Sequence, residues 1–210
     1  MRDGLVIAIP RGALLRKTLD LLDGLDVATG EIRDNERKLF FPDAGVLTVR
    51  PSDVPTYVEQ GAADLGITGK DVLLEQSDRE VYELADLGYG YCRMIVASAA
   101  DADPLGEGMR RRGVVRVATK YPRVAARHFA ETGRQAEIVE VKGSVELAPI
   151  TGLTDAIVDL TATGRTLEEN GLVEREAIVD CTARLIANPV AHKLKAPEID
   201  RLVERIRELQ

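Results

Sequence analysis

Short apolar runs rich in valine and isoleucine alternate along the chain with segments of helical periodicity. In the first 90 residues the strand-like runs are residues 5–9, 46–50 and 64–68. Between them, apolar residues three or four positions apart predict helices, one on the face of Leu14, Leu15, Leu19 and Leu22 and one capped by Ser52 or Asp53 and ending near Gly61. The pattern predicts a βαβαβα series.

The same alternation continues after residue 91. Strand-like runs occupy residues 92–97, 115–119, 136–141 and 155–160, and a helix is predicted from Pro122 to Gly133. The segment from Ala100 to Gly113 is polar, contains glycine and carries three consecutive arginines, so we interpret it as a surface connection. This part of the chain is also predicted to be α/β.

The last third contains a predicted strand at residues 177–183 and a final helix that starts at Pro197. The apolar stripe of this helix must pack on another element; it consists of Ile199, Leu202, Val203, Ile206 and Leu209. Because chain termini often return to the first domain, we expect two α/β lobes between which the chain crosses twice. The first comprises residues 1–90 plus 181–210 and the second residues 91–180.

Charge and composition narrow the possible functions. The 210 residues are 45% hydrophobic and 30% charged, with a net charge of -7 and a pI near 5.0. An acidic chain lacks the basic footprint of general nucleic-acid or membrane-surface binding. The apolar run near the N-terminus is too short for a signal peptide, and no run approaches the ~18 residues of a membrane span. The sequence therefore predicts a cytoplasmic protein.

The few cysteines and histidines do not suggest a metal centre. Cys92 and Cys181 each lie in an apolar run, which is typical of small core residues in a reducing compartment. His128 and His192 lie in helical patterns without ligand-like spacing to a cysteine or to each other. A structural zinc site is not expected.

The most informative segment is an apolar strand with the acids Asp155 and Asp159 that runs into the hydroxyl-rich loop 161–166 and then a helix. Unpaired amides at a helix start, a glycine and threonine hydroxyls can together bind a phosphate. A capping box formed by Thr166 and Glu169 explains the same spacing equally well. Asp159 favours a ligand, because its carboxylate could accept hydrogen bonds from sugar hydroxyls beside the phosphate. The combination indicates a phosphoribosyl ligand.

Two further loops join a strand to a helix through a glycine and a cation. They are Pro10-Arg11-Gly12 and the segment 66–71, which delivers Thr68, Gly69 and Lys70. Each alone is more simply a turn, but three such loops are typical of a ligand crevice at the carboxyl ends of α/β strands. Arg37-Lys38 and Arg50 flank an apolar stretch with a predicted turn at residues 42–45, and they are candidate phosphate contacts or exposed surface charges.

Two long motifs resemble the short form of the ATP phosphoribosyltransferase family over nearly the whole chain. The first is VPTYVEQGAADLGITGKDVL at residues 54–73, and the second combines KGSVELAP at residues 142–149 with DAIVDLTATGRTLEENGL at residues 155–172. The resemblance implies two lobes similar to type II periplasmic binding proteins, with the active site in the cleft between them. It also implies transfer of a phosphoribosyl group from phosphoribosyl pyrophosphate (PRPP) to ATP, with release of pyrophosphate, at the first step of histidine biosynthesis.

The resemblance assigns roles to individual residues. The residues expected to bind PRPP are Glu146, Asp155, Asp159, Thr161, Ala162, Thr163, Gly164, Arg165 and Thr166. The residues expected to contact ATP or pyrophosphate are Arg11, Gly12, Arg37, Arg50, Thr68, Gly69, Lys70 and Asp71. Among these, Arg50, Arg37 and Arg11 are the expected catalytic residues, because cations there could stabilise the departing pyrophosphate.

The resemblance also implies partners. Mg²⁺ would be carried by the phosphates of PRPP and ATP rather than by a protein cage. A separate regulatory subunit resembling histidyl-tRNA synthetase would confer histidine inhibition, and the catalytic chain would form a homo-oligomer, a dimer, within a hetero-oligomer. One departure from the family is the first turn, which usually reads Ser-Lys-Gly-Arg, whereas this chain has Pro10-Arg11-Gly12-Ala13.

Two other functions fit part of the pattern. A type I phosphoribosyltransferase acting on a free base has a similar loop, but it usually carries two adjacent acids before it, whereas Leu160 follows Asp159 here. A non-catalytic ligand-binding module of the periplasmic type would need an export signal. PRPP-dependent consumption of ATP distinguishes these alternatives.

Overall fold

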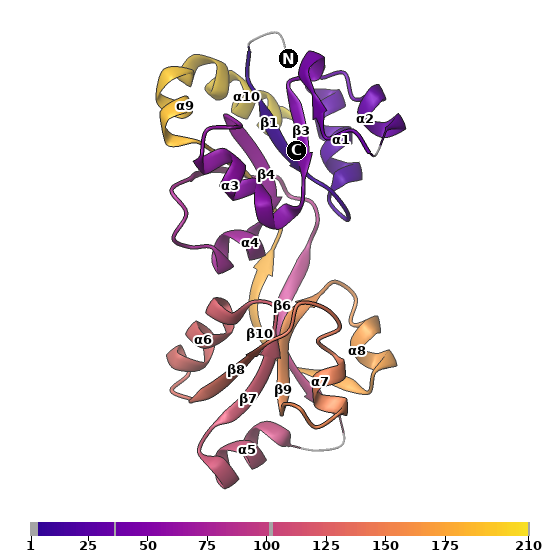
Figure 1. Ribbon diagram of the computed structural model, residues 1–210, viewed down its shortest axis with the longest axis vertical. Helices are drawn as coiled ribbons and strands as arrows, with labels where there is room; N and C mark the ends of the chain where they lie inside the picture. The colour runs from indigo at the N-terminus through magenta and orange to yellow at the C-terminus, as the bar shows by residue number, and fades with distance from the viewer. Residues whose placement is uncertain (1–3, 36, 101–102, 210) are drawn as a thin grey trace. The chain divides into compact units, whose positions relative to one another are not determined.

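The computed structural model describes residues 4–35, 37–100 and 103–209. The chain divides into two compact units, the first formed by Met1–Gly90 and Thr182–Gln210 and the second by Tyr91–Cys181. Each unit is a mixed α/β structure built on its own sheet, so the expected α/β class is confirmed (Figure 1).

The first unit contains a six-stranded sheet in the order β2-β3-β1-β4-β11-β5. Its strands are β1 (Ile7–Pro10), β2 (Phe40–Phe41), β3 (Val46–Val49), β4 (Leu65–Gly69), β5 (Tyr82–Asp86) and β11 (Ala183–Ala187). Its helices are α1 (Leu15–Gly24), α2 (Gly30–Asp34), α3 (Val54–Glu59), α4 (Lys70–Glu75), α9 (Pro189–Leu194) and α10 (Ala196–Glu208), with short 3-10 turns at Pro42–Ala44 and Pro51–Asp53. Strands β3, β1 and β4 are parallel neighbours, so their carboxyl ends share one edge.

Alternating side chains divide the core of the first unit between the two faces of the sheet. Ile7 and Ile9 of β1 pack with α1 and α10, whereas Ala8 faces the opposite side and packs with α3. A Cβ on Gly66 would lie only 2.6 Å from Val58 and 2.7 Å from Val54, so a glycine is required where α3 lies against β4. The β3-β1-β4 edge is therefore held by packing on both faces.

The second unit contains a five-stranded sheet in the order β10-β6-β9-β7-β8. Its strands are β6 (Cys92–Ala99), β7 (Val115–Thr119), β8 (Ala136–Glu140), β9 (Ala156–Thr161) and β10 (Leu172–Cys181). Its helices are α5 (Pro104–Arg112), α6 (Pro122–Glu131), α7 (Leu147–Ile150) and α8 (Arg165–Glu169). Ala118 and Ile157 pack with α7 and α8 on one face of this sheet. Strands β7 and β9 are parallel neighbours.

Two sequence interpretations were wrong in extent. The segment predicted to be a surface connection contains helix α5, which Pro104 opens, Asp103 caps by accepting from the Gly106 N–H, and Gly113 ends in a left-handed conformation. The strand predicted at residues 177–183 is two strands, because β10 ends at Cys181 in one unit and β11 begins at Ala183 in the other. The predicted turn at residues 42–45 is confirmed, since β2 and β3 are antiparallel around it.

Candidate functional site

In the second unit, two charged side chains meet at the carboxyl ends of parallel strands. The last paired residues of β7 and β9 are Thr119 and Val158, and Lys120 and Asp159 each follow by one position. The Lys120 ammonium lies 3.3 Å from Asp159 Oδ1, and the Asp159 side chain is only 14% exposed. Sequence reasoning missed Lys120, although it follows a predicted strand directly, which is the signal that was used for the other candidates.

Burial raises the pKa of Asp159 above its ordinary value. The positive charge of Lys120 and a hydrogen bond from the Leu160 N–H oppose this pKa shift, whereas the nearby negative charge of Glu146 adds to it. Glu146 immediately precedes α7. Its negative charge acts on Asp159, so the structure brings these two predicted residues together. The result is a half-buried group of two acids and one lysine beside the hydroxyl-rich loop.

The loop after β9 is shaped by its own threonines. Gly164 has a left-handed conformation with φ 78°. Its N–H donates to Thr161 Oγ1 at 2.9 Å, and the Arg165 N–H donates to Thr163 Oγ1 at 3.4 Å. Each of these hydroxyls accepts one bond and keeps its proton for a further acceptor. The loop Thr161–Thr166 therefore presents hydroxyl donors beside Asp159.

The alternative of a capping box is wrong. Thr166 is the second residue of α8, and the N-cap position is Gly164. The N-cap residue has no side chain to cap the helix, and among the described residues the start of α8 receives only the contact from the Thr163 hydroxyl to the Arg165 N–H. The hydroxyl of Thr166 is thus not used as a cap, which removes the simpler explanation of the loop sequence.

Asp155 lies apart from this group. It precedes β9, at the amino end of the strand, whereas Asp159 and the loop are at its carboxyl end. Its Oδ2 accepts hydrogen bonds from the Arg112 side chain and the Arg116 N–H. The structure therefore does not bring Asp155 together with the other predicted PRPP residues, and its contacts fix β9 to α5 and β7.

In the first unit, two arginines follow the paired strand residues at the equivalent position of the sheet. Pro10 of β1 pairs with Val49 of β3, and Arg11 and Arg50 each follow by one residue. The Arg11 N–H donates to the Val49 carbonyl at 2.8 Å, which fixes the two strand ends together. Arg50 is exposed and forms no ion pair with any described residue. Two neighbouring cations at one edge favour an anionic ligand.

The remaining predicted residues of the first unit lie along the same edge or on the β2 side. Lys70 follows β4 and forms an ion pair with Glu83 at 2.7 Å, so its charge is partly neutralised. The buried Thr68 hydroxyl donates to the Pro51 carbonyl, which attaches β4 to the turn after Arg50. Gly69 and Asp71 flank Lys70. Arg37 is exposed in the segment between α2 and β2.

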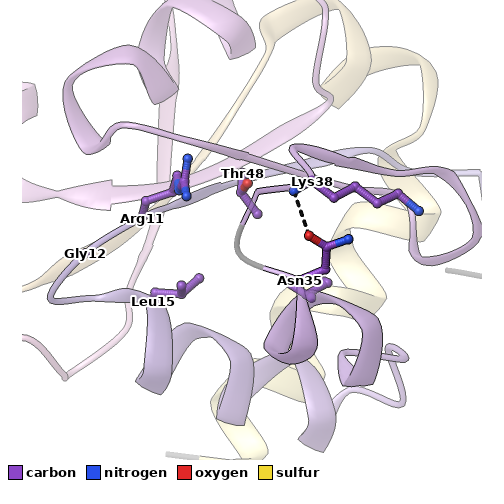
Figure 2. A pocket seen from close by; sticks show the side chains of 7 residues that line it. Arg11, Gly12, Leu15, Asn35, Lys38 and Thr48 are labelled. Atoms are coloured by element: carbon purple, nitrogen blue, oxygen red, sulfur yellow. Dashed lines mark hydrogen bonds between the residues drawn. The ribbon is translucent and has the colours of Figure 1, made fainter.

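A cavity of about 240 Å³ opens beside Arg11 within the first unit (Figure 2). Its lining residues come from the first turn, α1, the segment around α2 and β3: Arg11, Gly12, Leu15, Ile32, Asn35, Lys38 and Thr48. Sequence reasoning identified Arg11 and Gly12 but not Asn35 or Thr48. These two residues are 13 positions apart and face the same cavity because the β2–β3 hairpin folds back.

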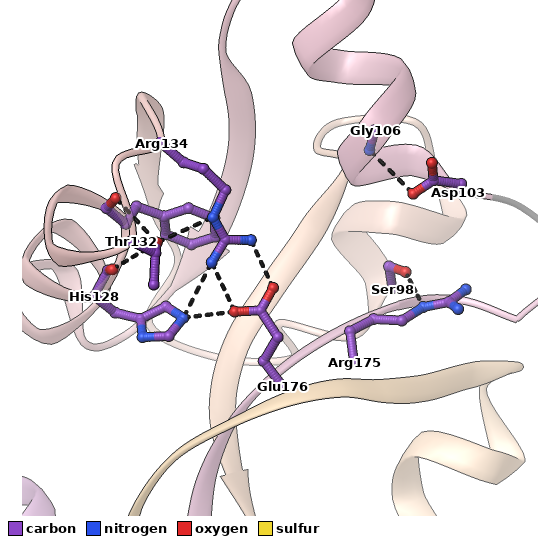
Figure 3. A network of polar contacts seen from close by, with 9 residues as sticks. Ser98, Asp103, Gly106, His128, Thr132, Arg134, Arg175 and Glu176 are labelled. Atoms are coloured by element: carbon purple, nitrogen blue, oxygen red, sulfur yellow. Dashed lines mark hydrogen bonds and ion pairs between the residues drawn. The ribbon is translucent and has the colours of Figure 1, made fainter.

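A second polar cluster in the second unit is saturated by its own contacts (Figure 3). The two oxygens of Glu176 accept two bonds from the Arg134 guanidinium, each at 2.6 Å, and one contact from His128 Nε2 at 2.8 Å. Arg134 also lies over the Phe129 ring. The hydrogen bonds from Arg134 lower the pKa of Glu176 below its ordinary value. This cluster joins α6 to β10 and is a structural ion pair rather than a ligand site.

Among residues 4–35, 37–100 and 103–209, no three His, Cys, Asp or Glu side chains gather as a metal cluster. In the same residues, no helix is both long and apolar enough to cross a membrane. Cys92 and Cys181 are register partners on β6 and β10.

Comparison with known proteins identifies the family. A family profile described as ATP phosphoribosyltransferase matches residues 50–208. The chain belongs to the ATP phosphoribosyltransferase family. An ATP phosphoribosyltransferase from Rubrobacter xylanophilus is 50% identical over 206 residues, which cover 97% of this chain and 95% of that protein. The enzyme is thus of the short form, and it catalyses the first step of histidine biosynthesis, the condensation of ATP with PRPP.

Solved structures agree with this assignment. The ATP phosphoribosyl transferase (HisG:HisZ) complex from Thermotoga maritima contains a chain 35% identical to this enzyme, with a TM-score of 0.82 and 97% of each chain covered. The periplasmic VFT2 domain of Bordetella pertussis BvgS matches with a TM-score of 0.55 at 15% identity, covering 100% of this chain and 94% of that domain. The second likeness is one of fold alone and confirms the expected similarity to periplasmic binding proteins.

Proposed function

We propose that the second unit of this ATP phosphoribosyltransferase binds PRPP at the carboxyl ends of β7 and β9. Residues Thr161–Thr166 hold the 5-phosphate, with hydroxyls and backbone amides as donors and Arg165 as the cation. Asp159 and Glu146 accept hydrogen bonds from the ribose hydroxyls. Lys120 keeps Asp159 ionised despite its burial, so that it acts as an acceptor at neutral pH.

The observation that carries this proposal is the largely buried Asp159 side chain beside a hydroxyl-rich loop at the start of α8. A half-buried pair of acids costs free energy unless hydrogen-bond donors satisfy it. One lysine and one backbone N–H satisfy only part of the acceptor capacity of two carboxylates. Ribose hydroxyls supply the missing donors, and the adjacent loop supplies donors for the phosphate of the same molecule.

We assign ATP and the departing pyrophosphate to the β3-β1-β4 edge of the first unit. Arg11 and Arg50 are the central cations, with Arg37 as a third, and Gly12, Thr68, Gly69, Lys70 and Asp71 form the surrounding loops. N1 of adenine attacks the anomeric carbon of PRPP, the bond to pyrophosphate breaks, and the configuration at that carbon inverts. N1 carries no proton that must be removed, so the chain provides alignment and positive charge rather than a general base.

Mg²⁺ fits the available side chains only as a companion of the substrates. The acids near the proposed PRPP site are Asp159 and Glu146, and Asp159 already pairs with Lys120. They provide fewer oxygen ligands than a protein cage requires, whereas Mg²⁺ commonly binds through substrate phosphates and one or two carboxylates. When bound in this way, the ion would neutralise charge on the leaving pyrophosphate.

We also propose a separate regulatory subunit. The Thermotoga maritima relative is a HisG:HisZ complex, and its catalytic chain matches this one over 97% of both lengths. The partner of this chain would resemble histidyl-tRNA synthetase and carry the histidine site, and the catalytic chain would form a dimer within the complex. Histidine inhibition of the purified catalytic chain alone would contradict the assignment of the histidine site to the partner.

The PRPP assignment is tested by Asp159→Asn. The amide keeps the size of the side chain but loses the charged acceptor for ribose hydroxyls, so KM for PRPP should rise roughly 10- to 100-fold with a much smaller change in KM for ATP. Initial rates with ATP and PRPP, followed by the ultraviolet absorbance of the N1-substituted adenine, measure both constants. Asp200→Asn, an exposed change on α10, is the control. An unchanged KM for PRPP would remove Asp159 from the site.

A further inference from the structure

The only two cysteines of the sequence lie directly opposite each other at one end of the antiparallel strand pair β6–β10 (Figure 1). Cys92 is the first residue of β6 and Cys181 is the last residue of β10. Opposed residues of antiparallel strands have Cα atoms ~4.5–5.5 Å apart and side chains on the same face of the sheet. This separation lies within the ~4.4–6.8 Å range of disulfide-bonded cysteines.

Contacts on both sides of the cysteine pair hold the two strand ends in register. The next two pairs of the ladder, Arg93 with Asp180 and Met94 with Val179, follow in regular succession, and the bulges of this strand pair lie beyond them. Asp180 points to the face opposite the cysteines, and its Oδ1 accepts a hydrogen bond from the Tyr91 hydroxyl at 3.0 Å. The two thiols are therefore kept opposite each other by backbone pairing and by a side-chain contact.

The two thiols differ in their access to solvent. Cys92 is partly exposed, whereas Cys181 is only 1% exposed. Reaction with an external reagent requires an accessible sulfur, so Cys92 is the cysteine that such a reagent reaches. Cys181 is restricted to a sulfur next to it. An accessible attacking cysteine beside a resolving cysteine is the arrangement that forms a disulfide by exchange.

We propose that Cys92 and Cys181 form a redox modification site, which a low-molecular-weight disulfide converts to an intramolecular disulfide bond. The Cys92 sulfur loses its proton and bonds to one sulfur of the reagent, whose S–S bond breaks, and the departing thiolate takes up a proton. The Cys181 sulfur loses its proton and displaces the second reagent thiolate from Cys92, which is protonated in turn. Two protein thiols are thus oxidised to one disulfide, and the reagent is reduced to two thiols.

The bond closes a loop of about 90 residues, nearly the whole second unit, which runs from Tyr91 to Cys181. Such a loop stabilises the fold by restricting the unfolded chain. The Cβ atoms of opposed residues are ~4.5–5.5 Å apart and a disulfide needs ~3.5–4.5 Å, so the strand ends must approach each other slightly. Their place at the end of the ladder permits this movement, and the resulting strain makes the bond easy to reduce. The modification is therefore reversible.

The cysteine pair shares no residue with the proposed PRPP and ATP sites, so its test is independent of theirs. The full-length enzyme is incubated with oxidised glutathione at neutral pH, next to Cys92→Ala, Cys181→Ala and the variant with both changes. Thermal unfolding before oxidation verifies that each variant is folded. After acid quenching, a thiol assay under denaturing conditions counts the remaining thiols, and mass spectrometry of proteolytic peptides locates each modification. The variant without cysteines is the control for reaction elsewhere.

In the unsubstituted enzyme we expect both thiols to be lost without a lasting glutathione adduct, and one peptide pair to be joined through Cys92 and Cys181. Cys181→Ala should keep glutathione on Cys92, because no second sulfur displaces it. Cys92→Ala should react at least ~10-fold more slowly, because its remaining thiol is buried. The unfolding midpoint of the oxidised enzyme should rise by roughly several degrees and return after reduction with dithiothreitol.

Four results would each overturn the proposal. They are a lasting glutathione adduct on Cys92 of the unsubstituted enzyme, disulfide-linked dimers of the chain, equal reaction rates of the two single variants, and an unfolding midpoint that does not rise on oxidation. The last result would mean that the bond forms only when the strand ends separate. Because the peptide map of the unsubstituted enzyme tests the bond directly, the proposal is decided even where a variant does not fold.

Discussion

The two units place different charges at the same structural position. In each sheet, the pairing of two adjacent parallel strands stops at one residue pair, and the next residue along each chain segment carries a charge. In the first unit these are Arg11 and Arg50, two like charges. In the second they are Lys120 and Asp159, which neutralise each other at 3.3 Å. The first edge is suited to bind anions and the second to accept hydrogen bonds from neutral hydroxyls.

The comparison shows how one architecture supports two kinds of recognition. The two arginines that follow β1 and β3 in the first unit are complementary to an anion at that edge. The ion pair of the second unit requires no counterion, and its buried acid needs donors instead. PRPP and ATP both contain phosphate groups and ribose hydroxyls, so both kinds of recognition suit the proposed substrates.

The largest effect is expected from Arg50→Ala. Removing one member of the cation pair should lower kcat/KM by roughly 10²- to 10³-fold, as for other groups that stabilise charge developing in the transition state. The melting temperature without ligand should not fall, because Arg50 is exposed and forms no ion pair with any described residue. Steady-state kinetics and thermal unfolding provide the two measurements.

Two further variants sharpen the result at position 50. Arg50→Lys keeps the charge but not the fork of donors, so it should recover part of the activity. Arg201→Ala removes an exposed arginine from α10 and should leave both measurements unchanged. Full activity of Arg50→Ala would show that Arg50 has no catalytic role. The difference in charge between the strand ends of the first and second units would then have no consequence for catalysis.

A smaller effect is expected from Lys120→Met, which turns the ion pair of the second unit into a lone buried acid. Burial raises the pKa of Asp159, and Lys120 opposes this rise. Without the lysine the pKa of Asp159 should rise further, so that its carboxylate protonates at a higher pH. The acid limb of kcat/KM for PRPP should therefore move to higher pH, with a several-fold loss near neutrality that grows as the pH falls.

The pH profile must be compared with that of the parent enzyme on the same substrate, so that protonation of PRPP itself cancels. Lys193→Met, which removes an exposed lysine from α9, is the control. The charged groups that face Asp159 are Lys120 and Glu146, so Glu146→Gln should shift the limb in the opposite direction. Superimposable profiles for Lys120→Met and the parent would show that Asp159 does not act as an ionised acceptor.

The sequence alone predicted part of the difference in charge between the strand ends of the two units. Strands Val115–Thr119 and Val46–Val49 were predicted to within a residue, because short valine-rich runs bounded by turns are unambiguous. Arg50 was proposed as a residue that flanks the second of these strands, whereas Lys120, which follows the first, was missed. Helix α5 was missed because glycines and charged residues mask its periodicity, although Asp103 and Gly113 are the residues that begin and end it.

Other features required the fold. Asp155 immediately precedes β9 and Asp159 lies within it, and only the strand direction shows that Asp155 is at the opposite end from the loop. The break between β10 and β11 is not visible locally, because residues on both sides of it continue the same alternation of apolar and polar positions. Asn35 and Thr48 carry no motif, and only the hairpin between them brings both to one cavity.

The smallest effect on activity is expected from Arg134→Met, in the saturated cluster of Arg134, Glu176 and His128. The effect of this change should be on stability alone. Hydrogen bonds from Arg134 lower the pKa of Glu176 in the folded protein. The ion pair therefore stabilises the fold at pH values above the ordinary pKa of glutamate. This stabilisation is lost as the pH falls through the lowered pKa of Glu176. The variant should lose about 1–3 kcal/mol of unfolding free energy at pH 7, with kcat/KM unchanged. Urea unfolding at pH 7 and below pH ~4 measures the difference, which should shrink in acid.

This dependence on pH separates two physical causes of the loss. Arg134 also packs over the Phe129 ring at 4.7 Å, and that contact does not depend on the ionisation of Glu176. A deficit of equal size at both pH values would therefore assign the stability to packing and not to the ion pair. Arg111→Met removes an exposed arginine with a distant partner and should change neither value. A loss of activity in Arg134→Met would instead mean that the saturated cluster and the Asp159 group are coupled, and the distinction between structural and ligand-binding charges in the second unit would fail.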